Sequence, residues 1–215
     1  MEAAMSQVKT VMPRLPLRGG ALCLNFANTS GWRPNPGEEE YLRDYEDLIA
    51  WAEHAGAVDP DEARKLLHAA RTNPERARSA HRRAIALREA IYRIFSAVAG
   101  GAAVNPPDTD LLNRALGAAN EHLRLAARDS GFEWVWHDVD GALELPLWRV
   151  VRSAASLLVS PEAERVRECS GENCDWLFLD ESKNRSRRWC DMATCGNRAK
   201  ARRNYTRRKQ AGAAS

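Results

Sequence analysis

Residues 169–198 read CSGENCDWLFLDESKNRSRRWCDMATCGNR and contain four of the five cysteines of the 215-residue chain. Cys169, Cys174, Cys190 and Cys195 follow the spacing C-x4-C-x15-C-x4-C, in which two close pairs flank an insert of hairpin length. This spacing can place four sulfurs at the corners of a tetrahedron, the arrangement that Zn²⁺ takes in closed structural sites. The pattern therefore predicts one zinc ion per chain, bound by these four residues.

Two disulfides or an iron–sulfur cluster are the alternative uses of four cysteines. The chain has no run of 18 or more apolar residues and begins without an apolar signal-peptide segment, so we expect a cytosolic protein. A reducing cytosol favours metal over disulfides, and the long basic insert suits a closed structural site better than a cluster. Four thiolates leave no open coordination position, which disfavours catalytic zinc. Cys23, alone in the apolar segment LCLNF, is predicted to be a buried core residue.

Charge is distributed unevenly along the chain. From Lys183 to Ser215 there are eleven Lys and Arg residues against one acid, Asp191, so this segment has a charge of +10. Residues 1–182 then have a charge of −7 within the total of +3. This asymmetry predicts an acidic body and a tail that binds a polyanion through phosphate contacts. The candidate nucleic-acid-binding residues are Lys183, Arg185, Arg187, Arg188, Arg198, Arg202, Arg203 and Arg207.

Residues 1–160 show the 3.6-residue periodicity of amphipathic helices. We expect helices over about residues 41–53, 59–70, 74–98, 110–127 and 146–160, the second of them opened by a capping box of Asp59 and Glu62. Residues 132–145, FEWVWHDVDGALEL, alternate at first and contain an Asp-Gly turn signal at 140–141, which predicts a short hairpin.

The predicted fold class is mainly α, in two domains. Residues 1–160 form a helical domain with a short β-hairpin, and residues 161–215 form a small four-cysteine zinc finger (β-hairpin and helix) with a basic tail. The finger has few core positions besides Trp176, Phe178 and Trp189, so its folding is expected to require metal. The helical domain has its own amphipathic faces, and we expect the two parts to fold independently.

The basic helix is predicted to start at the zinc site. Asn197 is a suitable N-cap for a helix beginning at Arg198, and Gly196 is expected to adopt positive φ directly after the last cysteine. Ala201 and Tyr205 form the one face without charge and are predicted to pack on the zinc module. Zinc would then anchor the start of the helix and direct its arginines.

The cysteine-rich segment resembles the C-terminal zinc finger of bacterial CGNR-type proteins, which are named for the residues that stand here as Cys195-Gly196-Asn197-Arg198. The match covers about residues 165–205 and includes WLFLD, KNRSRRWC and CGNRAKARR. Upstream, ALCLNFANTS resembles the opening of the ABATE domain that precedes this finger, with Asn25 where Asp is commoner. The Asn argues against an acid–base role at that position. The resemblance implies a stress-related transcription regulator with a DNA-binding finger and an ABATE-like regulatory domain.

These features favour a zinc-binding, DNA-binding transcription regulator that is cytoplasmic and associated with the nucleoid. An RNA- or ribosome-associated zinc protein is the alternative, because both polymers offer phosphates. The sequence has no nucleophile elbow, Walker loop or dinucleotide fingerprint, so no enzyme activity is expected. The expected partner is double-stranded DNA and not a membrane, while RNA, an unidentified small ligand and a homodimer remain open.

Asn25, Asn28 and Trp32 are the candidate ligand-binding residues of the helical domain. The two Asn residues lie three positions apart in an apolar segment, ALCLNFAN, that is predicted to be helical, so they share a face. Buried amides need hydrogen-bond partners. A structural network is one use of these groups and contact with a small molecule is the other.

Overall fold

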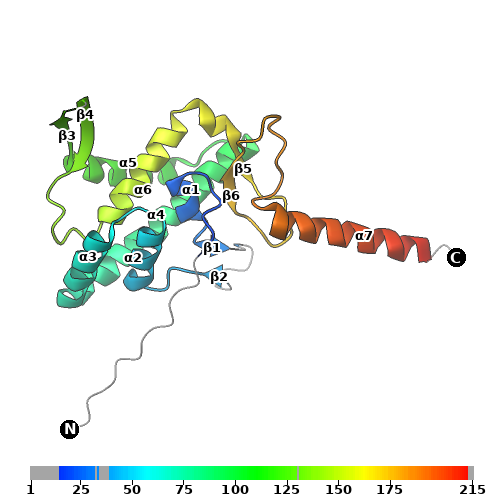
Figure 1. Cartoon of the computed structure of the whole chain (residues 1–215), viewed down its shortest axis with the longest axis horizontal. Coiled ribbons are helices and arrows are strands. Elements are labelled where there is room, and N and C mark those ends of the chain that lie inside the picture. Colours follow the sequence, from blue (N-terminus) through cyan, green and yellow to red (C-terminus); the bar gives the residue numbers. More distant parts are fainter. Residues whose placement is uncertain (1–14, 32, 34–38, 130, 213–215) are drawn as a thin grey trace, which may run out of the picture.

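The computed structural model describes residues 15–31, 33, 39–129 and 131–212, and it is mainly helical (Figure 1). The helical body contains α1 (Leu22–Ala27), α2 (Tyr45–His54), α3 (Pro60–Thr72), α4 (Pro74–Gly100), α5 (Pro106–Glu121) and α6 (Leu145–Leu158). A 3-10 turn, η1 (Pro161–Arg165), leads into the finger, where a π-helical turn, η2 (Met192–Gly196), precedes α7 (Asn197–Gly212). None of the described helices has the length and apolarity needed to cross a membrane.

The strands of the described residues form three antiparallel pairs. These are β1 (Ser30–Gly31) with β2 (Glu39–Glu40), β3 (Leu123–Arg128) with β4 (Gly131–Trp136), and β5 (Val166–Glu168) with β6 (Leu177–Leu179). The first pair closes the loop after α1, the second projects from the helical body, and the third belongs to the finger (Figure 1).

Helix α4 is the longest element of the body, and α1, α2, α3 and α5 pack against it. Its apolar face buries Leu87, Ile91, Ile94 and Phe95, as the sequence periodicity predicts. The predicted capping box of α3 is confirmed, because the Asp59 carboxylate accepts from the Glu62 amide while Glu62 accepts from the Asp59 amide. These local signals fix where the helices begin.

The predicted hairpin is displaced. Its first strand is β3, a segment expected to be the end of a helix. The two strands pair as far as Arg128 and Gly131, so the hairpin does not turn at Asp140-Gly141. Helix α5 instead ends at Glu121, and the Asp-Gly pair forms a turn before α6, with Gly141 at φ 69°. Pairing with the aromatic strand β4 overrides the helical propensity of the sequence LRLAAR.

The helical body and the finger share a hydrophobic core. Val166 of β5 and Leu177 of β6 are fully buried in the same cluster as α1, α4 and α6, and Leu179 packs on it. The opposite face of β6 turns Phe178 toward the cysteines. Alternate side chains of one strand therefore serve two cores. This arrangement favours coupled rather than independent folding of the two parts, since the body would lose buried surface without the finger.

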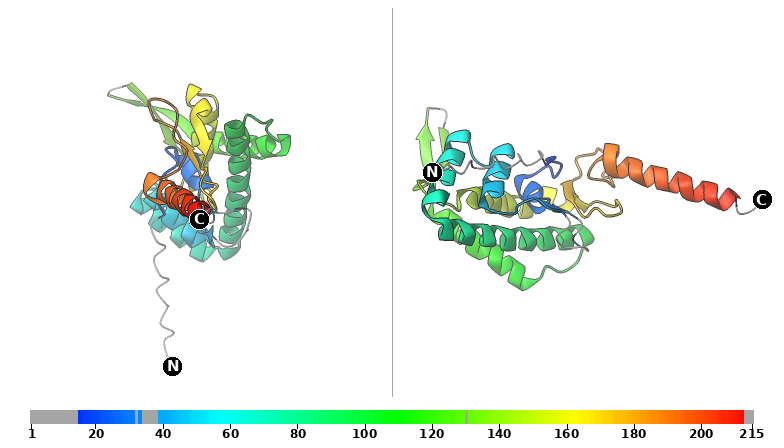
Figure 2. Two further views of the ribbon diagram at one scale, coloured as in Figure 1. Left: turned by 90° about the vertical axis from the view of Figure 1, so that its right-hand side faces the viewer. Right: turned by 90° about the horizontal axis from the view of Figure 1, so that it is seen from below.

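Helix α7 extends away from the rest of the molecule (Figure 2). The described side chains from Lys200 to Arg207 are all exposed, and Tyr205 keeps 69% of its surface in solvent. The expectation that Ala201 and Tyr205 pack on the zinc module is therefore wrong. The reason is geometric, because α7 contacts the η2 turn that precedes it and then extends away from the finger.

Candidate metal centre and basic tail

The four cysteine sulfurs of the finger form one cluster. The Sγ atoms of Cys169, Cys174, Cys190 and Cys195 all lie within 4.8 Å of one another. The Cys174–Cys190 and Cys190–Cys195 sulfur distances are both 3.7 Å. None of the five cysteines forms a disulfide.

These distances test whether zinc fits. Four ligands at a Zn–S distance of ~2.3 Å in a regular tetrahedron are separated by about 3.8 Å, and the two sulfur distances of 3.7 Å agree with this. An iron–sulfur cluster would hold its cysteines further apart, because the irons lie between them. The donor set and its spacing therefore fit a closed structural zinc site.

The surroundings of Cys169 favour thiolate at that sulfur. The amides of Gly171 and Cys190 point to Cys169 Sγ at 3.4 and 3.3 Å. Hydrogen bonds from Cys174 and Cys190 and then from these amides lower the pKa of Cys169. Hydrogen bonding to Cys169 and then to Cys190 in turn raises the pKa of Cys174. A divalent cation at the centre would favour the thiolate form of all four cysteines.

Two glycines of the finger have different roles. A Cβ on Gly171 would lie 3.1 Å from both Cβ and Sγ of Cys195 and 3.3 Å from Cys169 Sγ, so a larger residue at this position would press on two of the sulfurs. Gly196 is not among the positive-φ residues, contrary to expectation, because it ends the η2 turn and leads directly into α7. Asn197 is accordingly the first residue of α7 rather than its cap.

The loop between the cysteine pairs is organised by Asp180, which is fully buried. Its carboxylate accepts hydrogen bonds from the Ser182 amide and hydroxyl and from the Arg187 amide. Despite burial, these bonds lower the pKa of Asp180. The Arg187 side chain lies over the Phe178 ring at 4.4 Å and donates to the carbonyls of Trp189 and Cys190. Arg187 thus supports the metal site.

Each cysteine pair is joined to the N-terminal segment by a contact between an aspartate and an arginine, which we call a clamp. Asp175 directly follows Cys174 and accepts from the Arg33 amide at 2.8 Å and from its guanidinium at 3.4 Å. Asp191 directly follows Cys190 and forms an ion pair with Arg18. Sequence reasoning missed these clamps, although the repeated Cys-Asp dipeptide was a visible signal.

A partly buried charge network continues from the first clamp into α4. Arg33 pairs with Glu89 at 3.0 Å and stacks over Tyr92 at 3.7 Å. Glu89 also pairs with Arg88, which is 3% exposed and makes two 2.7 Å bonds to the Glu40 carboxylate. Breaking such a pair leaves an uncompensated buried charge. The network therefore fixes the finger relative to α4.

The candidate ligand-binding amides form structural hydrogen bonds. The Asn28 side chain donates to the Leu177 carbonyl and accepts from the Leu177 amide, both at 2.8 Å, so it pairs with β6 as a neighbouring strand would. Asn25 accepts from the Gly19 amide at 2.7 Å, and the Gly19 carbonyl accepts from the Leu179 amide. Trp32 lies outside the described residues. Cys23 is fully buried, as predicted, and burial raises its pKa to about 11.

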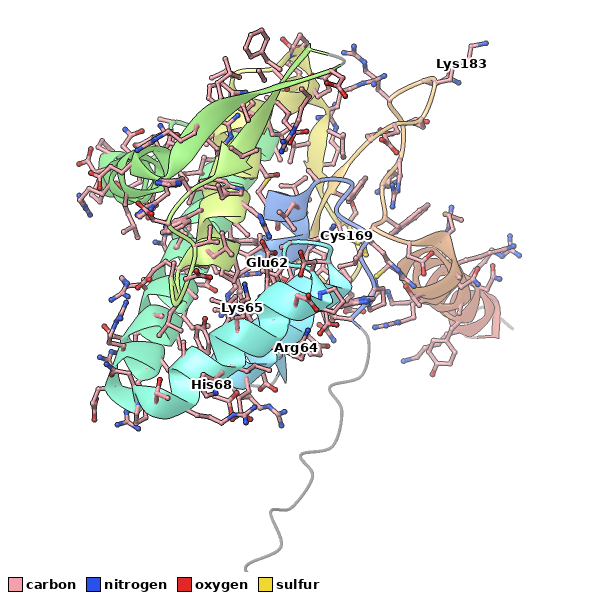
Figure 3. All side chains as sticks on the ribbon, turned by 60° about the vertical axis from the view of Figure 1, so that its left-hand side comes forward. Glu62, Arg64, Lys65, His68, Cys169 and Lys183 are labelled. Carbon is pink, nitrogen blue, oxygen red and sulfur yellow. The ribbon has the colours of Figure 1, made fainter. Side chains whose placement is uncertain are left out.

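The candidate basic residues occupy two neighbouring regions of the finger. Lys183, Arg185 and Arg188 are exposed on the loop between the cysteine pairs, and Lys183 lies at the end of that loop remote from Cys169 (Figure 3). Arg198, Arg202, Arg203 and Arg207 are exposed on α7, where Arg202 forms an ion pair with Glu172. Arg187, in contrast, is half-buried.

Two family models match the chain. Residues 20–161 match ABATE, described as "Putative stress-induced transcription regulator", and residues 165–208 match the CGNR zinc finger. No curated protein matches the sequence. The second match covers all four cysteines, so the chain contains a zinc finger whose cysteines are positioned to bind a single Zn²⁺ ion.

Proposed function

We propose that this member of the ABATE family is a transcription regulator that binds double-stranded DNA through α7 and the basic loop at residues 181–188. The chain belongs to the ABATE family and also contains a CGNR zinc finger. In this proposal the zinc site is structural, the protein is not an enzyme, and the helical domain has the regulatory role. The observation that supports it best is the exposure of α7 together with its charge.

The described side chains of α7 from Lys200 to Arg207 are exposed, and Arg202 forms an ion pair with Glu172. The helix contains seven Lys and Arg residues between Arg198 and Lys209 and no acid. Arg198 and Arg202, and likewise Arg203 and Arg207, lie four residues apart, a spacing at which like charges destabilise an isolated helix. A helix that is polar on all sides has no apolar face to bury, so packing against the protein adds little to its stability. A polyanion would relieve this repulsion, and the regular phosphates of a duplex suit a straight cationic rod.

The loop at residues 181–188 supplies a second set of cations. Asp180 holds the start and end of the loop through Ser182 and Arg187, which leaves Lys183, Arg185 and Arg188 free to face solvent. Arg185 has φ 48°, in the left-handed region. A loop held at its base offers cations at fixed positions, so phosphate contacts there cost little ordering entropy.

The proposal is tested by fluorescence anisotropy with a labelled DNA duplex and zinc-loaded full-length protein. If about five phosphates are contacted, log K should fall against log[salt] with a slope of about −4.5. Arg203→Ala and Arg207→Ala should each weaken binding to all duplexes alike and flatten the slope by about 0.9. Arg71→Ala removes an exposed arginine from α3 and serves as the charge-matched control, with no expected change.

Two results would contradict the proposal. Binding that does not depend on salt, or α7 variants that bind as wild type, would remove α7 as the nucleic-acid site. A structured RNA of equal length that binds more tightly than the duplex at the same salt concentration would instead support the RNA-associated alternative.

A further inference from the structure

We propose that a pocket between α4, α5 and α6 binds a small apolar anion, such as a medium-chain monocarboxylate. The pocket has a volume of about 300 Å³ and lies in the helical body, between helices that contain none of the zinc ligands. This inference goes beyond the proposed function, since it concerns binding by the protein without DNA.

The walls of the pocket are apolar. The apolar lining side chains from α4 and α6 are buried in the rest of the structure. They are Leu87 of α4 and Leu147, Trp148 and Val151 of α6. The facing helix α5 contributes small side chains, including Ala118, and their size leaves the space open. Water in such a hollow has few polar partners, whereas hydrocarbon would contact the apolar walls.

The indole of Trp148 is held in place from behind. It stacks on the His122 ring with centroids 4.0 Å apart and packs against Trp136 at 5.8 Å. An aromatic wall fixed by two neighbours needs little reorganisation when a ligand arrives, which favours binding.

The rim of the pocket has an excess of positive charge. Arg83, Arg114 and Glu144 are the three charged lining residues. Arg83 forms an ion pair with Glu144, so these two charges compensate each other. Within the described part of the chain, the exposed Arg114 guanidinium has no hydrogen bond or ion pair with protein. Guanidinium binds carboxylate through two parallel hydrogen bonds. The pocket is therefore suited to a ligand with an apolar body and one carboxylate head.

The size of the pocket limits the ligand. A volume of about 300 Å³ is at the lower end of the usual range for ligand pockets. At about 30 Å³ for each atom of water size, it accommodates on the order of ten non-hydrogen atoms. Octanoate has this size and chemistry, and octylammonium has the same hydrocarbon body with the opposite charge.

Isothermal titration of zinc-loaded full-length protein with these two probes tests the proposal. We expect one octanoate per chain and at least tenfold weaker binding of octylammonium. Arg114→Gln should weaken octanoate about tenfold through loss of the charge, and Ala118→Leu should weaken it at least tenfold by filling the pocket. Both positions are exposed on α5, and thermal unfolding of each variant establishes that it is folded. Arg71→Gln, on α3, is the control and should bind as wild type.

Any one of three results would overturn the proposal. These are no octanoate binding at millimolar concentration, octylammonium binding as tight as octanoate, and wild-type octanoate affinity in either α5 variant. DNA is absent from the titration, so the outcome is independent of whether the finger binds a duplex.

Discussion

Helices α3 and α7 have similar lengths but are stabilised in different ways. Helix α3 begins with a complete capping box, has side chains of both charge signs, and buries Ala63, Leu66 and Ala70 against the body. Helix α7 begins directly from the turn that holds the last zinc ligand, has only positive charges, and exposes its described side chains from Lys200 to Arg207. The fold of the body supports α3 along its length, whereas α7 is supported at its first turn, and under the proposed function DNA would stabilise the rest.

The largest effect should come from removing a zinc ligand. Cys190→Ser should abolish stoichiometric zinc binding, because structural zinc supplies on the order of 10 kcal/mol to isolated fingers. Since β5 and β6 share the core of the body, we also expect the melting temperature of the helical body to fall. Elemental analysis and thermal unfolding followed by circular dichroism measure the two effects.

The matched control is Cys23→Ala, which alters the cysteine that lies in the core of the body. It should retain about one zinc per chain and lose only packing energy. If Cys190→Ser leaves the thermal unfolding of the body unchanged, the shared core does not couple the two parts.

An intermediate effect is expected at the contact between α1 and the finger. Asn28→Ala removes both hydrogen bonds to the buried backbone of Leu177. Two buried groups then lack partners, which should lower the free energy of unfolding by about 2–4 kcal/mol. Urea denaturation measures this loss. The exposed Asn113→Ala is the control, and equal stability of the two variants would show that the amide does not pair with β6 in solution.

The smallest effect concerns the start of α3. The hydrogen bond from Arg149 lowers the pKa of Glu62 below its usual value. A lowered pKa in the folded state adds stability above the unfolded value of ~4.3, and this stability is lost as pH falls through the folded pKa. Glu62→Gln should therefore cost up to about 1 kcal/mol at pH 7, after allowance for solvent screening.

Urea denaturation at pH 7 and pH 3 checks the Glu62 prediction, because the difference between wild type and variant should shrink at the lower pH. Glu121→Gln, exposed at the end of α5, is the control. A difference of equal size at both pH values would mean that the charge of Glu62 is not the cause.

Local signals in the sequence predicted the features that depend on neighbouring residues. The cysteine spacing predicted the sulfur cluster, and Asp59 with Glu62 predicted the start of α3, because each signal lies within a short segment. The strand β3 was missed because LRLAAR has the composition of a helix and becomes a strand only through pairing with β4.

Contacts between distant segments escaped prediction for a different reason. Asn28 and Leu177 are 149 positions apart, and the Arg33–Asp175 clamp spans 142 positions. A single sequence does not show which residues of two such distant segments contact each other. The packing of the finger on the body could therefore not be derived from it. The Cys-Asp dipeptides at both cysteine pairs indicated that the acids had a role but not which arginines they meet.

The most direct test of the account is hydrogen exchange of zinc-loaded protein with and without a DNA duplex. Free protein should show protected amides in α3 and rapid exchange in α7 beyond its first turn, because like charges and the lack of packing destabilise that helix. Addition of the duplex should slow exchange across α7 and leave α3 unchanged. An α7 that is as protected as α3 without DNA, or whose exchange does not respond to DNA, would contradict the account.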